Sequence, residues 1–162
     1  MLIHEMTKDE CCAALGSANI GRLACARDGQ PYVVPMYYSY DGKHIYAFST
    51  LGQKIEWMRS NPLVCLEIDD RKSHFQWMCV IVSGRYEELP DTRDFEFERA
   101  HAHGVLQKRA NWWQPALVPP EHREGLTPIF YRIHINRMTG HRATPDTVEA
   151  ATLSARDTLS DR

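Results

Sequence analysis

Apolar and polar residues alternate along residues 20–49, and two Asp-Gly pairs divide this segment into three runs. Alternation with a period of two is typical of strands that have one buried face. Asp-Gly pairs favour tight hairpin turns because glycine tolerates a positive φ. The segment therefore predicts a meander of three consecutive strands, which we expect at residues 20–27, 31–40 and 43–49.

Pro35 lies in the middle of the second of these strands. Proline cannot donate a hydrogen bond to a neighbouring strand, because it has no backbone N–H. We therefore expect the strand to be interrupted, bulged or at the edge of the sheet at this point.

Three helices and three further strands are predicted outside the meander. Thr7 and Glu10 have the spacing of a capping box, which marks the start of a helix. Asn61 is expected to end the second helix, because a residue that precedes proline avoids the α region. Gly84 is expected to bend the long fifth strand. The helices are expected at residues 8–17, 52–60 and 92–109, and the strands at residues 63–69, 75–89 and 127–137.

These elements predict a mainly β domain with flanking helices, built as a closed or partly closed antiparallel barrel of six strands. A parallel α/β sheet would need helical crossovers, and residues 20–49 leave no room for them. The length fits one domain, expected at residues 1–145, with a flexible tail at residues 146–162. Residues 110–126, with three prolines and two tryptophans, predict a structured loop.

Composition narrows the class of protein. The net charge is −2, the sequence pI is about 6.4, and no block of basic residues occurs, which argues against nucleic acid as the main partner. No apolar run has the length of a membrane span, and the first residues lack a signal-peptide pattern, so we expect a cytoplasmic protein. The five cysteines include no CxxC pair and are expected to be reduced thiols, three of them buried in strands.

The segment after the third strand has the groups that a phosphate site requires. Two hydroxyls, a glycine and a lysine precede or begin a helix, where backbone amides and positive charge favour an anion. The segment matches neither the Walker loop nor the dinucleotide fingerprint. Considered alone, a turn that caps the helix is the more common explanation. The residues concerned are Ser49, Thr50, Gly52, Gln53 and Lys54.

Several motifs follow one another in order from GRLA through PYVVPMYY, IYAFST, GQK and RSNPLVCLEID to QWMCVIVSGRYEELPD. Together they resemble the pyridoxamine 5'-phosphate oxidase-like family of FMN-binding split barrels, nearest the branch of the nitroimidazole-resistance nitroreductases. The resemblance covers residues 5–92 well, and the WWQPA and MTGHR segments more loosely. It implies a six-stranded split barrel with FMN as cofactor. It also implies a homodimer with two flavin sites in the subunit interface.

The resemblance implies a role for each matching residue. The strand that holds the polar edge of the isoalloxazine through its backbone matches Val34, Pro35, Met36 and Tyr37. The positions beside the ribityl phosphate match Ser49 and Thr50, followed by Gln53 and the phosphate-binding Lys54.

Three other residues are candidates at the same site. Gln76 and Trp77 match the start of the strand that reaches the flavin held mainly by the other subunit. Arg22 has a planar guanidinium that suits a phosphate, although a salt bridge at the dimer interface explains it equally well.

Two departures from the family limit what the resemblance implies. Phe48 stands where the nitroimidazole-resistance members have a histidine, so the same reduction mechanism is not expected. The last third of the chain also lacks the arginine- and tryptophan-containing ending of authentic pyridoxamine 5'-phosphate oxidases. We therefore do not expect this chain to be the vitamin B6 oxidase.

The sequence thus predicts an FMN-dependent oxidoreductase that passes electrons from a nicotinamide donor to an unidentified small acceptor. A flavin-binding protein for storage or sensing is the alternative, and a split barrel that uses F420 or haem is another. No residue pattern identifies a catalytic acid or base.

Remaining candidates have simpler explanations. His101 and His103 are two residues apart on a predicted helix and point apart, so a metal site is not expected. His141 is expected to lie in a solvated tail. Trp112 and Trp113 either wall the flavin site or pack the loop against the barrel, and packing is the favoured explanation.

Overall fold

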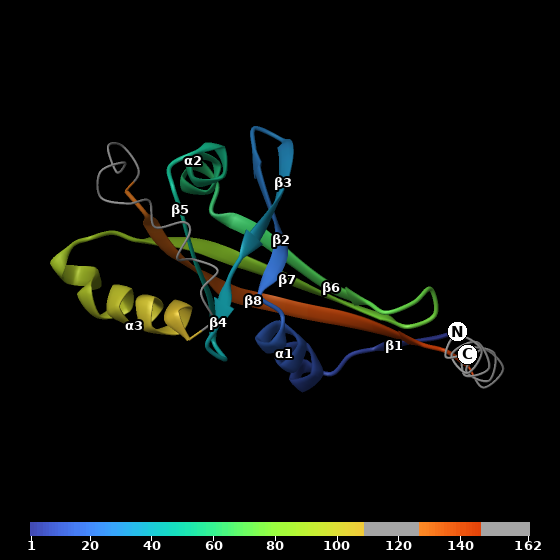
Figure 1. The fold of residues 1–162 in the computed structure, drawn as a ribbon. Helices are drawn as coiled ribbons and strands as arrows, with labels where there is room; N and C mark the ends of the chain where they lie inside the picture. Colours follow the sequence, from blue (N-terminus) through green and yellow to red (C-terminus); the bar gives the residue numbers. More distant parts are fainter. Residues whose placement is uncertain (109–126, 147–162) are drawn as a thin grey trace, which may run out of the picture.

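The chain forms one antiparallel sheet that curls on itself, with helices packed around it (Figure 1). A computed structural model describes residues 1–108 and 127–146. The elements in chain order are β1 (Leu2–Glu5), α1 (Lys8–Ser17), β2 (Ile20–Arg27), β3 (Gln30–Tyr37), β4 (Ser39–Tyr40), β5 (His44–Ser49), α2 (Gln53–Ser60), β6 (Leu63–Arg71), β7 (Trp77–Leu89), a 3₁₀ turn η1 (Arg93–Phe95), α3 (Glu96–Gln107) and β8 (Ile129–Thr144).

The chain itself joins the two edge strands of the sheet. Its strands follow the order β3-β2-β6-β7-β8-β5-β4, and β1 pairs with β8 outside this path. β3 and β4 stand at opposite ends of the path, yet only Tyr38 separates them in the chain. The two edges of the curled sheet therefore meet at Tyr38. The predicted mainly antiparallel β fold with flanking helices is confirmed.

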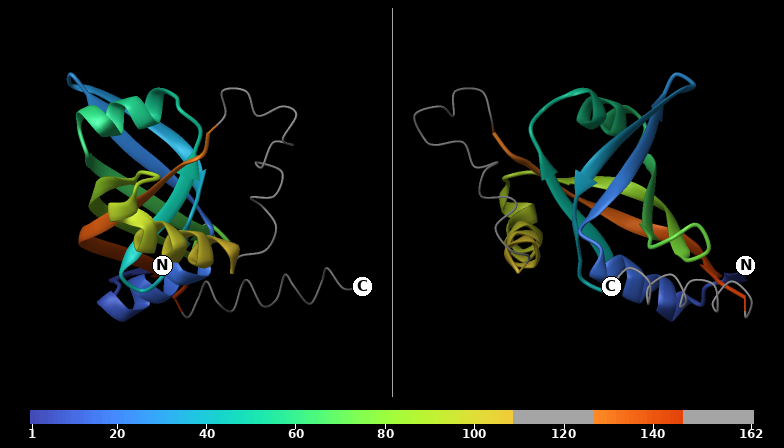
Figure 2. Two further views of the ribbon diagram at one scale, coloured as in Figure 1. Left: turned by 90° about the vertical axis from the view of Figure 1, so that its left-hand side faces the viewer. Right: turned by 45° about the vertical axis from the view of Figure 1, so that its right-hand side comes forward.

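One hydrophobic core fills the interior of the curled sheet, and a helix covers each end (Figure 2). Ile55 and Met58 bury the inner face of α2 at one end. Leu15 does the same for α1, and its carbonyl accepts a hydrogen bond of 2.9 Å from the buried hydroxyl of Tyr38. This bond ties α1 to the point where the two sheet edges meet.

A second, smaller cluster fixes α3 to the outer side of the sheet. Ala102, Val105 and Leu106 pack against Tyr46 of β5 and Leu89 at the end of β7. The burial stripe follows the helical repeat, so α3 is held mainly by its apolar face. Within the described ranges, 1–108 and 127–146, no helix is long and apolar enough to cross a membrane.

Most predicted elements are present. The third helix begins at Glu96, after the 3₁₀ turn η1, instead of at residue 92, and the larger differences are at the strands. The capping box is confirmed, because Thr7 and Glu10 each bond to the other's backbone amide. The described residues form eight strands rather than the six predicted, since β1 was not predicted and β4 is separate from β3. β8 continues to Thr144 instead of ending at residue 137, and His141 therefore lies in a strand and not in a tail. The loop at 110–126 and the tail from residue 147 lie outside the described residues.

The expected bend at Gly84 is confirmed. The register of β7 against β8 shifts between Ser83 and Gly84. A Cβ atom at Gly84 would lie 2.5 Å from the carbonyl oxygen of His134 and 2.6 Å from a methyl group of Ile133. Only glycine lets the two strands approach so closely at the bulge.

Gly84→Ala is expected to lower the free energy of unfolding by ~1–3 kcal/mol, because the backbone of β8 must move to admit the methyl group. Urea unfolding measures the change. Gly104→Ala is the matched control, since nothing lies within 4 Å of its added Cβ in α3. It is expected to raise the free energy of unfolding by ~0.5–1 kcal/mol through helix propensity. Equal effects of the two substitutions would contradict the close approach at Gly84.

Candidate functional site

The turn from β5 into α2 presents backbone amides that no side chain caps. β5 ends at Ser49, and α2 begins at Gln53 with Gly52 as its N-cap. Within residues 1–108 and 127–146, no side-chain hydrogen bond caps this helix, so the explanation of the serine-threonine turn as a helix cap is wrong. The first amides of a helix have no partner within it and attract an anion. The turn thus keeps the donors that a phosphate would use.

Lys54 adds a cation to this helix end. It belongs to the first turn of α2, its side chain is partly buried, and burial lowers the pKa of its ammonium. In the part of the chain that the structure describes, the Cys25 thiol is the one titratable group that shifts the pKa of Lys54 in the other direction. Among the described residues, no carboxylate contributes to this shift. A partly buried cation without a counter-ion is unfavourable, and a bound phosphate would relieve this cost.

β3 lies at the edge of the sheet, with β2 as its neighbour in the strand order. This position agrees with one of the three alternatives for Pro35, since an edge strand tolerates a residue without an N–H. The side chain of Met36 is buried in the core, whereas Pro35 and Tyr37 are exposed on the outer side and Val34 is half-buried. An edge strand has backbone groups that face away from its neighbour, as the predicted contact with a planar heterocycle requires.

Arg22 lies on the outer face, directly opposite Pro35 on one side and Glu67 on the other. Its Nη1 donates to Glu67 Oε2 at 2.9 Å and to Asp69 Oδ1 at 2.5 Å. These two hydrogen bonds are the largest causes of the raised pKa of the guanidinium. Arg22 therefore has counter-ions within its own chain, and its role toward a phosphate stays a prediction.

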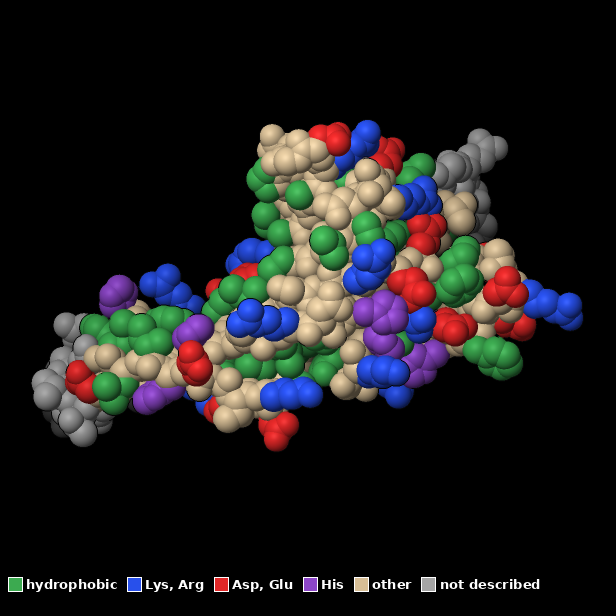
Figure 3. Space-filling model, turned by 180° about the vertical axis from the view of Figure 1, so that it is seen from behind, with side chains coloured by type: hydrophobic (Ala, Val, Ile, Leu, Met, Phe, Trp, Pro, Cys, Tyr) green, Lys and Arg blue, Asp and Glu red, His purple; other side chains and the backbone are tan. Residues whose placement is uncertain are grey.

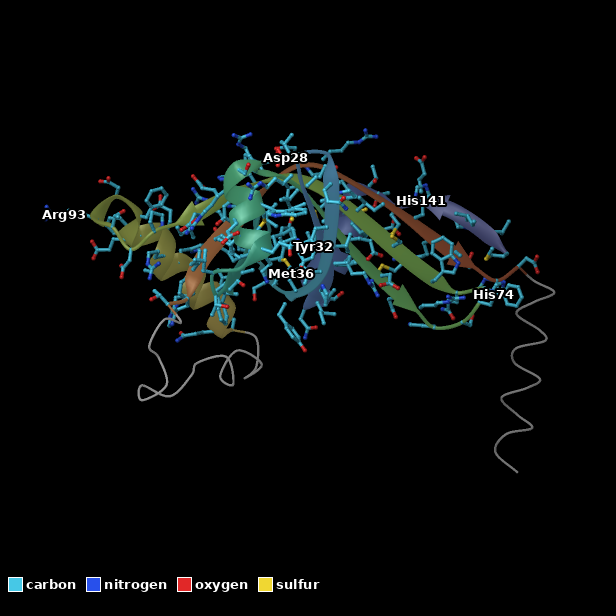
Figure 4. All side chains as sticks on the ribbon, turned by 90° about the horizontal axis from the view of Figure 1, so that it is seen from above. Asp28, Tyr32, Met36, His74, Arg93 and His141 are labelled. Atoms are coloured by element: carbon cyan, nitrogen blue, oxygen red, sulfur yellow. The ribbon has the colours of Figure 1, made fainter. Side chains whose placement is uncertain are left out.

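Gln76 and Trp77 lie far from Lys54 in the same chain. Trp77 begins β7 and Gln76 directly precedes it, at the tip of the long β6–β7 hairpin. In Figure 4, His74 marks this tip, whereas Tyr32 and Met36 of β3 lie near the centre of the view. The candidate residues thus form two groups. One group is made of the β5–α2 turn and β3, and the other is the hairpin tip. Within a single chain, the fold does not bring them together.

Several of the described histidines contact other side chains. Figure 3 shows them in two separate places on the surface, one beside α3 and one toward the far end of the long strands. Beside α3, His101 bonds to Asp41 at 2.9 Å, and the rings of His44 and His134 are 4.7 Å apart. Among the described residues, no group of three or more His, Cys, Asp or Glu side chains could hold a metal ion. His141 is exposed on β8, opposite Cys79.

Other candidates are also accounted for. Phe48 points away from the barrel interior, and its ring packs 5.7 Å from that of Phe130 beside the α3 cluster. All five cysteines are free, and burial raises the pKa of four of them, which keeps them protonated: Cys11, Cys25, Cys65 and Cys79. Trp112 and Trp113 lie outside the described residues.

Sequence reasoning missed the neighbours that define this electrostatic environment. Cys25 was predicted to be buried, but its position beside Lys54 depends on how α2 packs across the end of the barrel. Glu67 and Asp69 alternate on one face of β6, which is visible in the sequence. Their pairing with Arg22 depends on the register of β6 against β2, which is not visible there.

The comparisons with known proteins agree with this architecture. The family model described as pyridoxamine 5'-phosphate oxidase matches residues 7–142. The chain belongs to this family, and the resemblance inferred from the motifs is confirmed.

Individual relatives cover nearly the whole domain. An uncharacterised protein of Rhizobium meliloti (strain 1021) is 44% identical over 146 residues, which are 88% of this chain and 97% of that protein. The crystal structure of a FAD-binding protein from Mesorhizobium loti is 43% identical with a TM-score of 0.72, covering 90% of this chain and 99% of its own. A candidate 5-nitroimidazole antibiotic resistance protein of Bacteroides thetaiotaomicron is 18% identical with a TM-score of 0.64, covering 88% and 89% of the two chains. The last similarity shows the shared split-barrel fold alone.

Lys54→Met is expected to raise the free energy of unfolding of the ligand-free protein by ~0.5–1 kcal/mol, because it removes a partly buried charge without a counter-ion. The lowered pKa of Lys54 predicts a change in the same direction. Protonated Lys54 lowers the free energy of unfolding at neutral pH, and this effect disappears above the pKa that the lysine has in the unfolded chain. Urea unfolding of protein stripped of ligand measures the effect. Lys43→Met, at an exposed position, is the control. A loss of stability in Lys54→Met beyond that of the control would contradict the absence of a counter-ion.

Proposed function

We propose that this chain binds a flavin nucleotide whose first phosphate lies at the β5–α2 turn. The observation that carries the proposal is Lys54, a partly buried cation without a carboxylate partner among the described residues, beside a helix end that no side chain caps. Ser49 and Thr50 precede the same helix end and supply two hydroxyl groups. Phosphate is the anion that suits backbone amides, hydroxyls and an ammonium together.

FMN is the form that the motifs imply, and FAD is the second candidate. The Mesorhizobium relative, at 43% identity, is a FAD-binding protein. This similarity supports a flavin as the ligand and supports FAD as well as the motifs support FMN. Both cofactors share the isoalloxazine, the ribityl chain and the first phosphate. The contacts proposed for Lys54 and for the β3 edge therefore serve either molecule.

We propose further that the functional unit is a homodimer. A single chain keeps the hairpin tip with Gln76 and Trp77 away from the turn that contains Lys54. A second copy related by a two-fold axis can place its hairpin tip against the first copy's β3 edge. Each flavin would then have its phosphate held by one subunit and its ring covered partly by Trp77 of the other.

The proposed activity is electron transfer from a nicotinamide donor to a small acceptor. The bound flavin supplies the redox chemistry, and the protein supplies binding and orientation. Lys54 and the helix amides hold the phosphate, while backbone groups of β3 orient the ring. The five free cysteines fit the reducing conditions of the cytoplasm, where we place the protein. A flavin-binding protein without turnover is the alternative.

The purified protein is expected to show flavin absorption, and denaturation should release FMN or FAD, which chromatography distinguishes. Lys54→Ala is expected to weaken the binding of the released cofactor at least tenfold, about 1.4 kcal/mol. Lys43→Ala, which removes an exposed lysine, should leave the affinity within twofold. A loss below threefold in Lys54→Ala would show that this lysine is not a ligand. A single intense Soret band would indicate haem instead.

Oxidation of NADH or NADPH with an added quinone tests the activity. Turnover above that of the same concentration of free flavin is expected for an oxidoreductase. A rate equal to that of free flavin would favour the non-catalytic alternative.

A further inference from the structure

The described part of the chain leaves one face of the sheet uncovered by helices. The uncovered face is formed by the outward-pointing residues of β2, β3, β6 and β7, while the alternate residues of these strands fill the core. The helices pack elsewhere: α3 over β5 and the start of β8, α2 across one end of the barrel, and α1 against Gly140 on the inner side. The exposed large apolar side chains of the uncovered face are Ile20, Val33, Tyr37, Leu63 and Ile81.

The uncovered face carries more apolar surface than a solvated sheet normally does. Of the ten large hydrophobic side chains that are exposed among the described residues, five belong to it, with exposed fractions from 44% for Ile81 to 60% for Val33. An antiparallel sheet with one solvated face alternates between apolar inward residues and polar outward residues. Along β7, however, residues 77–82 (WMCVIV) are apolar on both sides. This pattern is typical of a sheet that is covered on both faces, and exposed apolar surface of this kind marks a docking site.

The charged groups at the centre of the uncovered face are paired within the chain. Strand register aligns four residues in one row across the four strands: Pro35, Arg22, Glu67 and Ile81. The Arg22 guanidinium donates to Glu67 at 2.9 Å and to Asp69 at 2.5 Å, so it keeps its counter-ions when the face is covered. Covering a paired charge costs less than covering an unpaired one. This row can therefore lie inside an interface.

Trp77 lies on the uncovered face too, because alternation along β7 places it on the same side as Cys79 and Ile81. It lines a hollow of about 390 Å³ together with Glu67, Asp69 and Cys79. Figure 1 shows that β6 and β7 continue past the barrel to the hairpin tip where Trp77 begins its strand. The hairpin tip and the β3 edge therefore border one surface.

We propose that a second copy of this chain docks on the uncovered face, and that this docking does not need the flavin. The inference deepens the proposed function, since it names the surface through which the two copies of the proposed dimer meet. A second copy is the partner that fits, because a two-fold contact covers the same apolar residues in both copies. A face-to-face pair can also bring each hairpin tip to the β3 edge of the other copy.

The driving force for this docking is present in the empty protein. The apolar side chains of the uncovered face belong to the sheet itself, whereas the proposed phosphate site is at Lys54 and the β5–α2 turn. Removal of apolar surface from water favours association whether or not a cofactor is bound. The two copies are therefore expected to meet first, and the flavin is expected to enter an interface that already exists.

Sedimentation analysis of protein stripped of flavin tests the docking. The original protein is expected to sediment as a dimer, with twice the chain mass of 18.7 kDa. Ile81→Lys puts a charge at the centre of the uncovered face, and Glu67 directly opposite makes this charge tolerable in the single chain. The substitution is expected to raise the dissociation constant of the dimer at least about tenfold, because docking must remove the ammonium from water.

Phe97→Lys is the matched control, because Phe97 is 85% exposed on α3 and does not belong to the uncovered face. It is expected to change the dissociation constant less than twofold. Urea unfolding shows whether each variant is folded. Val33→Lys charges the same face from β3 and decides the matter if Ile81→Lys does not fold.

Three outcomes would overturn the proposal. The original protein sediments as a monomer, or it forms a dimer that Ile81→Lys and Phe97→Lys affect alike, or it dimerises only after FMN or FAD is added. The proposed function fails separately from this inference. If the stripped protein is a dimer that Ile81→Lys dissociates, but neither FMN nor FAD binds to the original protein, the docking surface is retained and the flavin function is disproved.

Discussion

The pairing of β7 with β8 is the constraint on which the rest of the fold depends. These two strands stay in register from Trp77 to Leu89 except for one bulge at Gly84. The other edge of β8 pairs with β5 near its start and with β1 near its end. The pair β7–β8 therefore forms one wall of the barrel and continues beyond it as an extension that ends at the tip of the β6–β7 hairpin. The bulge allows the change in direction between these two parts.

This division separates the two halves of the candidate site. The barrel part carries α2, and with it Lys54, across one end of the core. The extension carries Gln76 and Trp77 to the tip of the hairpin. The two groups of candidate residues can form one site only if a second copy brings its hairpin tip to the β3 edge of the first copy, as in the proposed dimer. In that dimer, Lys54 would hold the phosphate and the hairpin tip of the second copy would cover the ring.

Local signals in the sequence were sufficient for much of the fold. The Asp-Gly turns and the alternation predicted the meander, and Thr7 with Glu10 predicted the start of α1. β1 could not be predicted, because all four of its residues are exposed and only pairing with β8 makes it a strand. The extension of β8 to Thr144 has the same cause, since its partner there is β1.

Local sequence likewise predicted one part of the candidate site, whereas the other part depends on contacts between residues far apart in the chain. The order of motifs identified the family and the turn that contains Lys54, because those residues are close in sequence. The lack of a carboxylate beside Lys54 among the described residues depends on how α2 packs, and the two carboxylates beside Arg22 depend on strand register. The uncovered face depends on the pairing of β2 with β6, which three strands and a helix separate in the chain. Such distances in sequence leave no local pattern.

The central claim is that the site recognises a flavin through its phosphate. Riboflavin and FMN differ only in that phosphate, so their dissociation constants for protein stripped of cofactor test the claim directly by fluorescence titration. The account predicts that FMN binds at least tenfold more tightly than riboflavin, a difference of about 1.4 kcal/mol. Equal affinity for the two molecules would contradict it.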